Sequence, residues 1–163
     1  MIHILIPLAG KSLFFQDPLF HFPKPLIEID GVPMIQRVIK NLQSIKADKK
    51  FIFVLDAIDC TKFHLDDVVR LLVEEPCEVI LLHGETRGAA CSALFAIEQI
   101  NNDAELIIAN ADQIIHADLN DIIQNFQKRE LDAAVICFDS VHPRWSFVQV
   151  DDDGAIVGLS IYC

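Results

Sequence analysis

Short, continuous apolar runs alternate along this chain with longer segments in which apolar residues recur every three or four positions. A short apolar run is typical of a strand buried on both faces, and the longer spacing is typical of an amphipathic helix. The runs predict strands at Ile2–Ile6, Leu26–Ile29, Phe51–Leu55, Glu78–Leu82, Leu106–Ala109 and Ala133–Phe138. The spacing predicts helices from Pro33 to Ile45 and over His64–Val73, Gly88–Ile100 and Leu119–Lys128, the last capped by Asp118 or Asn120.

The repeated alternation of strand and helix predicts a parallel sheet with helices on both faces. Near the end of the chain, Phe147–Val150 and Ile156–Leu159 flank Asp151-Asp152-Asp153-Gly154, which predicts a β-hairpin. Ligands of parallel sheets bind beyond the carboxyl ends of the strands. We therefore expect function in the loops 7–25, 56–62, 83–88, 110–117 and 139–146.

Composition narrows the class of protein. The chain has 163 residues, of which 52% are hydrophobic, and this fits one globular domain over residues 1–163. No apolar run approaches the ~20 residues of a membrane helix, so we expect no membrane association. The five cysteines are dispersed and form no CxxC pair, which predicts reduced thiols in a cytoplasmic protein.

The charge is unevenly distributed. The net charge of −11 argues against nucleic-acid binding. Residues 1–50 hold seven Lys and Arg against four Asp and Glu, a balance of +3, so the remainder carries −14. A basic N-terminal third is compatible with a small anionic ligand.

Lys24 is the first candidate for that ligand. It stands between Pro23 and Pro25, and proline fixes its own φ and biases the preceding residue away from helix. A lysine on such a stiff segment suits a phosphate group. A proline-rich surface turn with a solvated lysine is the alternative.

Two glycine-containing loops are candidates for nucleotide contacts. Leu8-Ala9-Gly10-Lys11-Ser12 follows the first strand, where the backbone can approach a phosphate; a simple strand-end turn is the alternative. Gly88 and Ala89 open the third predicted helix, where small side chains admit a flat group. Tight packing of helix on sheet selects the same residues.

Polar groups also follow the later strands. Asn110 and Asp112 come after the fourth strand, and a carboxylate there can hold Mg²⁺ alongside phosphate oxygens, or instead cap a helix. His142 and Trp145, the only tryptophan, can line a sugar site; the alternative is a tryptophan that covers the edge of the core.

In this order along the chain, these segments resemble the sugar-phosphate nucleotidyltransferases, in particular the bacterial branch of capsule and lipopolysaccharide precursors. The matching segments are collinear and are Ile4–Gly10, Pro23–Glu28, Gly31–Ile35, Gly88–Cys91, Ala109–Gln113 and His142–Val148. The resemblance implies a Rossmann-like three-layer α/β/α fold with a mostly parallel mixed sheet, of the nucleotide-diphospho-sugar transferase type. It also implies transfer of a nucleotide from a nucleoside triphosphate to a sugar 1-phosphate, with release of pyrophosphate.

The resemblance also implies a role for each candidate. Lys24 would contact the phosphates and act in catalysis, Leu8–Ser12 would cradle the triphosphate, and Asp112 would bind Mg²⁺ as cofactor. Gly88, Ala89 and Asn110 would hold the nucleotide, and His142 and Trp145 would face the sugar. The expected partners are a nucleoside triphosphate and a sugar phosphate, with a homo-oligomer as a further expectation.

The sequence departs from the family pattern in two places. Ser12 and Phe14 stand where the family carries a second glycine and an arginine, and losing a bidentate phosphate contact often costs about 2–4 kcal/mol in the transition state. The chain also ends before the family's Glu-Lys pair and second metal-binding Asp, so we expect the C-terminal part to be lacking. Three hypotheses stay open: a nucleotidyltransferase, an impaired nucleotide- or sugar-binding regulatory homologue, and a glycosyltransferase that uses a nucleotide sugar.

Overall fold

The structure, a computed structural model, describes residues 1–10, 22–142 and 145–160. The chain divides into two compact units, Met1–Asn125 and Phe126–Cys163. The first unit holds the central sheet and its covering helices, and the second holds a β-hairpin.

The central sheet of the first unit has four strands in the order β5-β4-β1-β6, and every neighbouring pair is parallel. Ile4 of β1 lies in register with Phe51 of β4 on one side and Ile107 of β6 on the other. The strands are β1 (Ile2–Pro7), β4 (Lys49–Asp56), β5 (Cys77–Leu82) and β6 (Glu105–Ile108).

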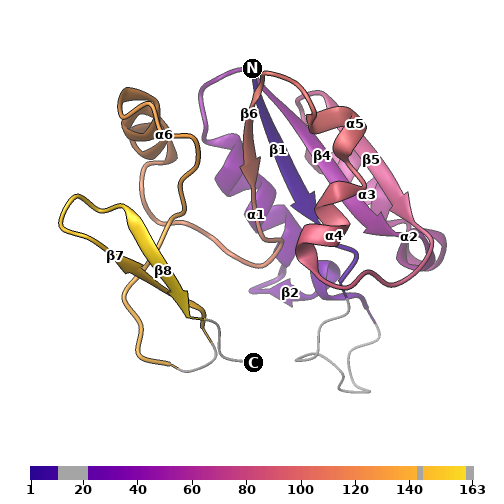
Figure 1. The fold of residues 1–163 in the computed structure, drawn as a ribbon. Coiled ribbons are helices and arrows are strands. Elements are labelled where there is room, and N and C mark those ends of the chain that lie inside the picture. The colour runs from indigo at the N-terminus through magenta and orange to yellow at the C-terminus, as the bar shows by residue number, and fades with distance from the viewer. Residues whose placement is uncertain (11–21, 143–144, 161–163) are drawn as a thin grey trace. The chain divides into compact units, whose positions relative to one another are not determined.

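Helices cover both faces of this sheet, and α4 and α5 cross in front of it in Figure 1 whereas α1 passes behind. Successive side chains of β1 point to opposite faces of the sheet and so enter two separate hydrophobic cores. The larger core lies on the face covered by α1 and α3. Ile4 and Ile6 face α1 and α3, and Leu5, between them, faces α4 and α5. These helices are α1 (Met34–Gln43), α3 (Leu65–Leu72), α4 (Ala89–Leu94) and α5 (Ile97–Ile100), with α2 (Ala57–Phe63) following β4.

Three short elements join β1 to α1, and α6 follows β6. The short elements are a 3-10 helix, η1 (Lys24–Leu26), and the hairpin of β2 (Glu28–Ile29) and β3 (Val32–Pro33). Helix α6 (Leu119–Lys128) packs Leu119 into the larger core. The Asp118 side chain caps this helix: its Oδ1 accepts hydrogen bonds from the side-chain Nδ2 and from the backbone N–H of Asn120, and these two bonds lower the pKa of the Asp118 carboxyl.

These findings confirm the predicted α/β fold with helices on both faces of a parallel sheet. The predicted hairpin is also present, as β7 (Phe147–Val150) and β8 (Ile156–Ser160). Two predicted elements differ in the structure: the strand at Leu26–Ile29 is reduced to Glu28–Ile29, since Leu26 ends η1, and the helix at Gly88–Ile100 is broken between α4 and α5.

The prediction of a strand at Ala133–Phe138 is wrong for the described residues. No strand is formed there, and Val135, Ile136 and Phe138 are exposed. A short apolar run marks a strand only where another backbone pairs with it, and hydrophobic spacing carries no information about that partner.

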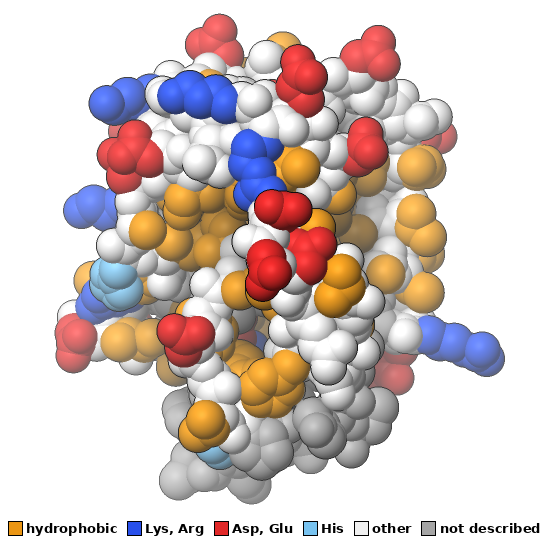
Figure 2. Space-filling model, turned by 60° about the vertical axis from the view of Figure 1, so that its left-hand side comes forward, with side chains coloured by type: hydrophobic (Ala, Val, Ile, Leu, Met, Phe, Trp, Pro, Cys, Tyr) orange, Lys and Arg blue, Asp and Glu red, His pale blue; other side chains and the backbone are white. Residues whose placement is uncertain are grey.

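Figure 2 shows exposed hydrophobic side chains interspersed with acidic and basic ones on one face of the molecule.

None of the helices in the described part of the chain is long and apolar enough to cross a membrane.

Two leucines of α3 test the assignment of its buried face. Leu65 is 0% exposed and Leu71 is 85% exposed. We expect Leu65→Ala to lower the free energy of unfolding by ~2–5 kcal/mol because it removes buried methyl groups and leaves a cavity. Leu71→Ala, the matched control, should change it by less than ~0.5 kcal/mol. Urea denaturation measures both, and equal losses would contradict this packing.

Candidate functional site

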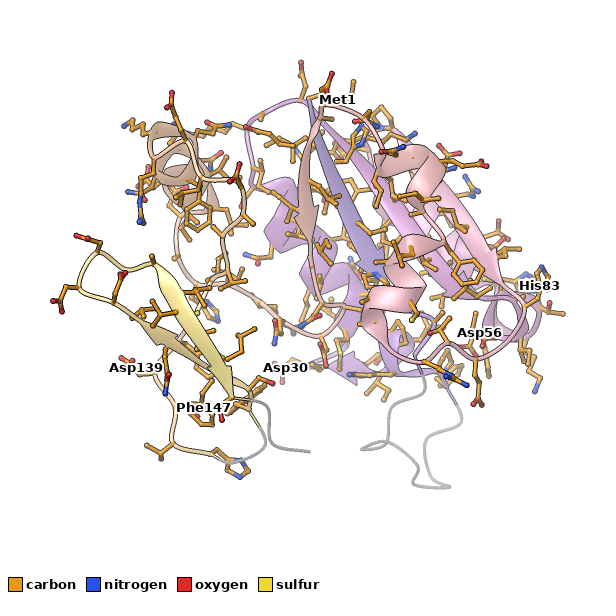
Figure 3. All side chains as sticks on the ribbon, in the orientation of Figure 1. Met1, Asp30, Asp56, His83, Asp139 and Phe147 are labelled. Atoms are coloured by element: carbon orange, nitrogen blue, oxygen red, sulfur yellow. The ribbon has the colours of Figure 1, made fainter. Side chains whose placement is uncertain are left out.

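The carboxyl ends of the four parallel strands lie at one edge of the sheet. In Figure 3, Asp56 at the end of β4 and His83 just after β5 lie at the end of the sheet away from Met1. The loops that follow β1 and β6 begin at the same edge because these strands run in the same direction. Most of the sequence-predicted site residues of the first unit stand in these loops.

The most informative contact at this edge joins Lys24 and Asp112. The Lys24 Nζ donates a hydrogen bond to Oδ2 of Asp112, across 88 positions of sequence. The side chains are 28% and 36% exposed, so ligands can reach both groups. The structure therefore brings together the lysine and the carboxylate that the sequence singled out separately.

Local backbone geometry holds Lys24 in place. Pro23 is extended, with φ −63° and ψ 151°, and Pro25 is buried directly behind the lysine. The Lys24 carbonyl accepts a hydrogen bond from Ile27, and the Ile27 carbonyl accepts one from Met34 at the start of α1. Lys24 is thus fixed to the framework of the fold, unlike the solvated turn lysine of the alternative.

Asp112 lies in a turn beyond β6. The N–H of Ala109 donates to Leu5 of β1 and so extends the pairing of β6 by one residue, after which Asn110, Ala111 and Asp112 leave the sheet. The alternative of a helix-capping aspartate is not borne out, because Asp118 caps the next helix instead. Asn110 is exposed at the edge itself.

The loop after β1 begins with a residue that is fully engaged by the fold. The N–H of Leu8 donates to the carbonyl of Val54, and the Leu8 side chain is buried in the larger core. Leu8 therefore anchors the start of the loop, after which Ala9 is half-buried and Gly10 is exposed. The predicted residues Lys11 and Ser12, together with Phe14, lie outside the described residues.

Gly88 is the N-cap that precedes α4, and its backbone conformation, with φ 132° and ψ 172°, favours glycine. Two hydroxyls meet beside it: Thr86 and Ser92 lie 2.6 Å apart, and both reach the Gly88 carbonyl. The sequence reasoning did not single out Thr86 and Ser92. A threonine and a serine that flank a helix-opening glycine were the available signal. Ala89, the first residue of α4, is exposed.

His142 and Trp145 belong to the second unit. The N–H of Trp145 donates to the carbonyl of His142, so the backbones of these two residues are in direct contact. The indole also meets Phe138 edge-to-face, with the ring centroids 5.2 Å apart. Trp145 is half-buried and His142 is exposed.

The donor set at Asp112 suits Mg²⁺ shared with a substrate. Among the described residues, no three His, Cys, Asp or Glu side chains form a group that could hold a metal. Magnesium commonly takes only one or two protein carboxylates and completes its shell with phosphate oxygens and water. Asp112 offers one accessible carboxylate, and a cation, the Lys24 ammonium, already lies against it.

Cys60 is not a candidate nucleophile. Cys60, Cys77, Cys91 and Cys137 are free thiols. Burial and the nearby carboxylate of Asp66 raise the pKa of Cys60 to about 11, so this thiol stays protonated at neutral pH.

In open parallel α/β sheets, ligands bind beyond the carboxyl ends of the strands, and the pair of Lys24 and Asp112 lies at that edge. The sequence profile of the MobA-like NTP transferase domain matches residues 5–151. This chain therefore belongs to that family of nucleotidyltransferase domains, which confirms the family expected from the sequence motifs. A comparison with the curated proteins found no match.

Solved structures share the fold. A nucleoside-diphosphate-sugar pyrophosphorylase from Vibrio cholerae RC9 is 20% identical, with a TM-score of 0.75 over 97% of this chain and 66% of that one. HddC from Yersinia pseudotuberculosis complexed with GMP-PN is 19% identical, with a TM-score of 0.70 over 98% of this chain and 69% of that one. A CMP:2-keto-3-deoxy-manno-octonic acid synthetase complexed with CTP is 17% identical, with a TM-score of 0.68 over 98% of this chain and 63% of that one. This chain thus spans about two thirds of the length of these proteins.

Two glycines of the site offer a matched test of the backbone. Gly88→Ala should lower the free energy of unfolding by ~1–3 kcal/mol, because alanine is strained at this φ and ψ. Gly10→Ala should cost less, since an added Cβ there meets nothing within 4 Å and the backbone is outside the left-handed region. Chemical denaturation of the two variants measures the difference. A Gly88→Ala variant as stable as the parent chain would refute the assigned loop conformation.

Proposed function

We propose that this chain transfers a nucleotide from a nucleoside triphosphate to a sugar 1-phosphate, giving a nucleotide sugar and pyrophosphate. The observation that carries the proposal is the contact between Lys24 and Asp112 at the carboxyl edge of the sheet. We further propose that the whole chain acts as one nucleotidyltransferase-like domain, since the family match at residues 5–151 runs through both units.

The chemistry assigned to Lys24 is electrostatic. Its ammonium leaves the Asp112 carboxylate and binds the oxygens of the triphosphate, where it stabilises the negative charge that develops as the sugar phosphate attacks the α-phosphorus. The fixed backbone at Pro23 and Pro25 keeps the lysine aimed at this edge. Transfer of this kind needs positioning and charge stabilisation but no covalent protein intermediate.

Asp112 takes the complementary part. Its carboxylate, released by Lys24, would hold Mg²⁺ together with phosphate oxygens of the nucleotide. When bound there, Mg²⁺ neutralises phosphate charge and orients the leaving pyrophosphate. In the absence of nucleotide, Lys24 and Asp112 neutralise each other, so neither charge stands without a partner at the edge of the sheet.

The remaining residues are assigned to the two substrates. The loop from Ala9 through Lys11 and Ser12 would cradle the triphosphate, with Leu8 as its anchor in the core. Gly88, Ala89 and Asn110 would hold the nucleotide, and the hydroxyls of Thr86 and Ser92 would stabilise the loop at Gly88. His142 and Trp145 would contact the sugar.

The nucleotides bound in solved relatives support the substrate class. HddC is complexed with GMP-PN, the octonic acid synthetase with CTP, and a UDP-glucose pyrophosphorylase, 17% identical with a TM-score of 0.70, with UDP-glucose. A role in the supply of precursors for bacterial polysaccharides, in the cytoplasm, fits this class. A homo-oligomer stays a prediction.

A second candidate is a homologue that binds nucleotide without turnover. Ser12 and Phe14, where the family carries glycine and arginine, favour it. Loss of the bidentate arginine contact corresponds to a rate roughly 30- to 1000-fold lower. Pyrophosphate release distinguishes the homologue that only binds nucleotide from the active nucleotidyltransferase.

Pyrophosphate release is the direct test of transfer. The chain is incubated with Mg²⁺, each of the common nucleoside triphosphates and a panel of sugar 1-phosphates. We expect release with at least one pair and a rate ~10²–10³-fold lower in Lys24→Met, which keeps the aliphatic stem but removes the charge. Lys50→Met is the matched control, because Lys50 pairs with Glu78 at similar exposure, 26% and 43%, but at the other end of the strands. Nucleotide binding without release from any pair would favour the second candidate.

Calorimetry tests the metal assignment. Asp112→Asn should weaken nucleotide binding in the presence of Mg²⁺ by ~10-fold or more, because an amide is a poorer ligand than a carboxylate for this cation. Binding measured in EDTA should not weaken, because without Mg²⁺ the Asp112 carboxylate has no cation to hold and only competes with the nucleotide for Lys24. Glu78→Gln serves as the control, and equal affinity of Asp112→Asn and the parent chain in Mg²⁺ would rule out Asp112 as the metal ligand.

A further inference from the structure

We infer that Asn41 is a positioning residue that holds Asp112 against Lys24. This inference rests on the proposed function for its biological meaning, but its geometry is independent of any ligand. Asn41 lies in α1, whereas Asp112 lies in the turn beyond β6. The two are connected through one residue, Ile115.

The Asn41 side chain binds both backbone groups of Ile115. The N–H of Ile115 donates to Oδ1 of Asn41 at 2.9 Å, and Nδ2 of Asn41 donates to the carbonyl of Ile115 at 3.0 Å. The primary amide thus pairs with Ile115 as a neighbouring strand would. The contact is partly buried, so removal of the Asn41 amide would leave the N–H and the carbonyl of Ile115 without this partner.

The segment that carries Asp112 depends on such support. Residues 110–118 form neither helix nor strand, so no regular ladder fixes their backbone. Ile115 follows Asp112 by three residues and packs its side chain against the larger core. The two bonds from Asn41 therefore fix the backbone a short distance from the carboxylate.

Helix α1 also fixes the other member of the pair. The N–H of Met34, at its first residue, donates to the carbonyl of Ile27, whose own N–H donates to the carbonyl of Lys24. One buried helix thus supports Lys24 at its first residue and the Asp112 segment at Asn41. The separation of ammonium and carboxylate is set by this helix.

The chain contains a matched control. Asn120 makes the same kind of two-point contact in the reverse direction, from α6 to the residues after α1. Its Oδ1 accepts from the N–H of Lys46 at 2.7 Å, and its Nδ2 donates to the carbonyl of Ser44 at 3.1 Å. Asn120 lies beyond the end of the irregular segment, farther along the chain from Asp112 than Ile115 does. Removing it should lower stability without moving Asp112.

A zero-length cross-link measures the contact without any nucleotide. A carbodiimide activates a carboxylate, and an amine in direct contact displaces the urea to form an amide bond. In the parent chain we expect a Lys24–Asp112 cross-link, quantified by mass spectrometry against the Lys50–Glu78 cross-link of the same molecule, whose N–O distance is 2.7 Å. Asn41→Leu should lower this ratio at least threefold, and Asn120→Leu should leave it unchanged.

Nucleotide affinity gives a second readout. With Mg²⁺ and the triphosphate that the parent chain binds best, Asn41→Leu should lose at least about fivefold in affinity, and its affinity in EDTA should change less than twofold. Asn120→Leu should change neither. If Asn41→Leu fails to fold, Asn41→Asp, which keeps the acceptor for Ile115 and loses the donor, should show an intermediate cross-link ratio.

The outcomes separate this inference from the proposed function. An unchanged cross-link ratio in folded Asn41→Leu or Asn41→Asp overturns the positioning role and leaves the proposed function standing. An equal loss in Asn41→Leu and Asn120→Leu also overturns it, because general destabilisation would then explain both. Absence of the Lys24–Asp112 cross-link from the parent chain would instead contradict the contact on which the proposed function rests.

Discussion

Strand β1 lies between β4 and β6 and pairs with both in parallel, and the arrangement of the candidate site depends on this pairing. Parallel strands end at the same edge, so the turns after β1, β4, β5 and β6 meet there although they are far apart in sequence. The alternation of side chains along β1 buries both faces under helices, which leaves the ends of the strands as the place where polar groups can gather. The contact of Lys24 with Asp112 is the direct result.

The contact of Lys24 with Asp112 places one positive and one negative charge side by side at the carboxyl edge of the sheet. A lysine and a carboxylate that neutralise each other can separate when a phosphate and a metal cation arrive together. The ammonium then binds the phosphate and the carboxylate binds the cation, so each keeps a partner of opposite charge. At the exposures seen here, the pair itself contributes little to stability. Its value lies in placing two opposite charges where a magnesium-bound nucleotide would need them. Helix α1, through Met34 and Asn41, sets the distance between the two segments that carry these charges.

Much of the fold could be predicted from the sequence, because the strands of the central sheet are continuous apolar runs and α1, α3 and α6 have regular helical spacing. The strand predicted at Ala133–Phe138 is absent because the spacing of apolar residues says nothing about a pairing partner. The break between α4 and α5 likewise has no strong signal, since no glycine or proline marks it. The motifs around Lys24 and Asp112 identified the family, but their contact could not be predicted from residues 88 positions apart without the sheet order. Asn41 could not be found at all, because an asparagine within an amphipathic helix resembles any solvent-facing residue.

A double-mutant cycle tests whether Lys24 and Asp112 act on a bound nucleotide as one unit. The affinity for the magnesium-bound triphosphate is measured by calorimetry for the parent chain, Lys24→Met, Asp112→Asn and the double variant. We expect strong non-additivity, with a coupling free energy of about 1 kcal/mol or more, because each residue takes its place on the ligand only when the other releases it. Losses that add within about 0.3 kcal/mol would refute this coupling, because they would show that the two groups bind independently or do not touch the ligand.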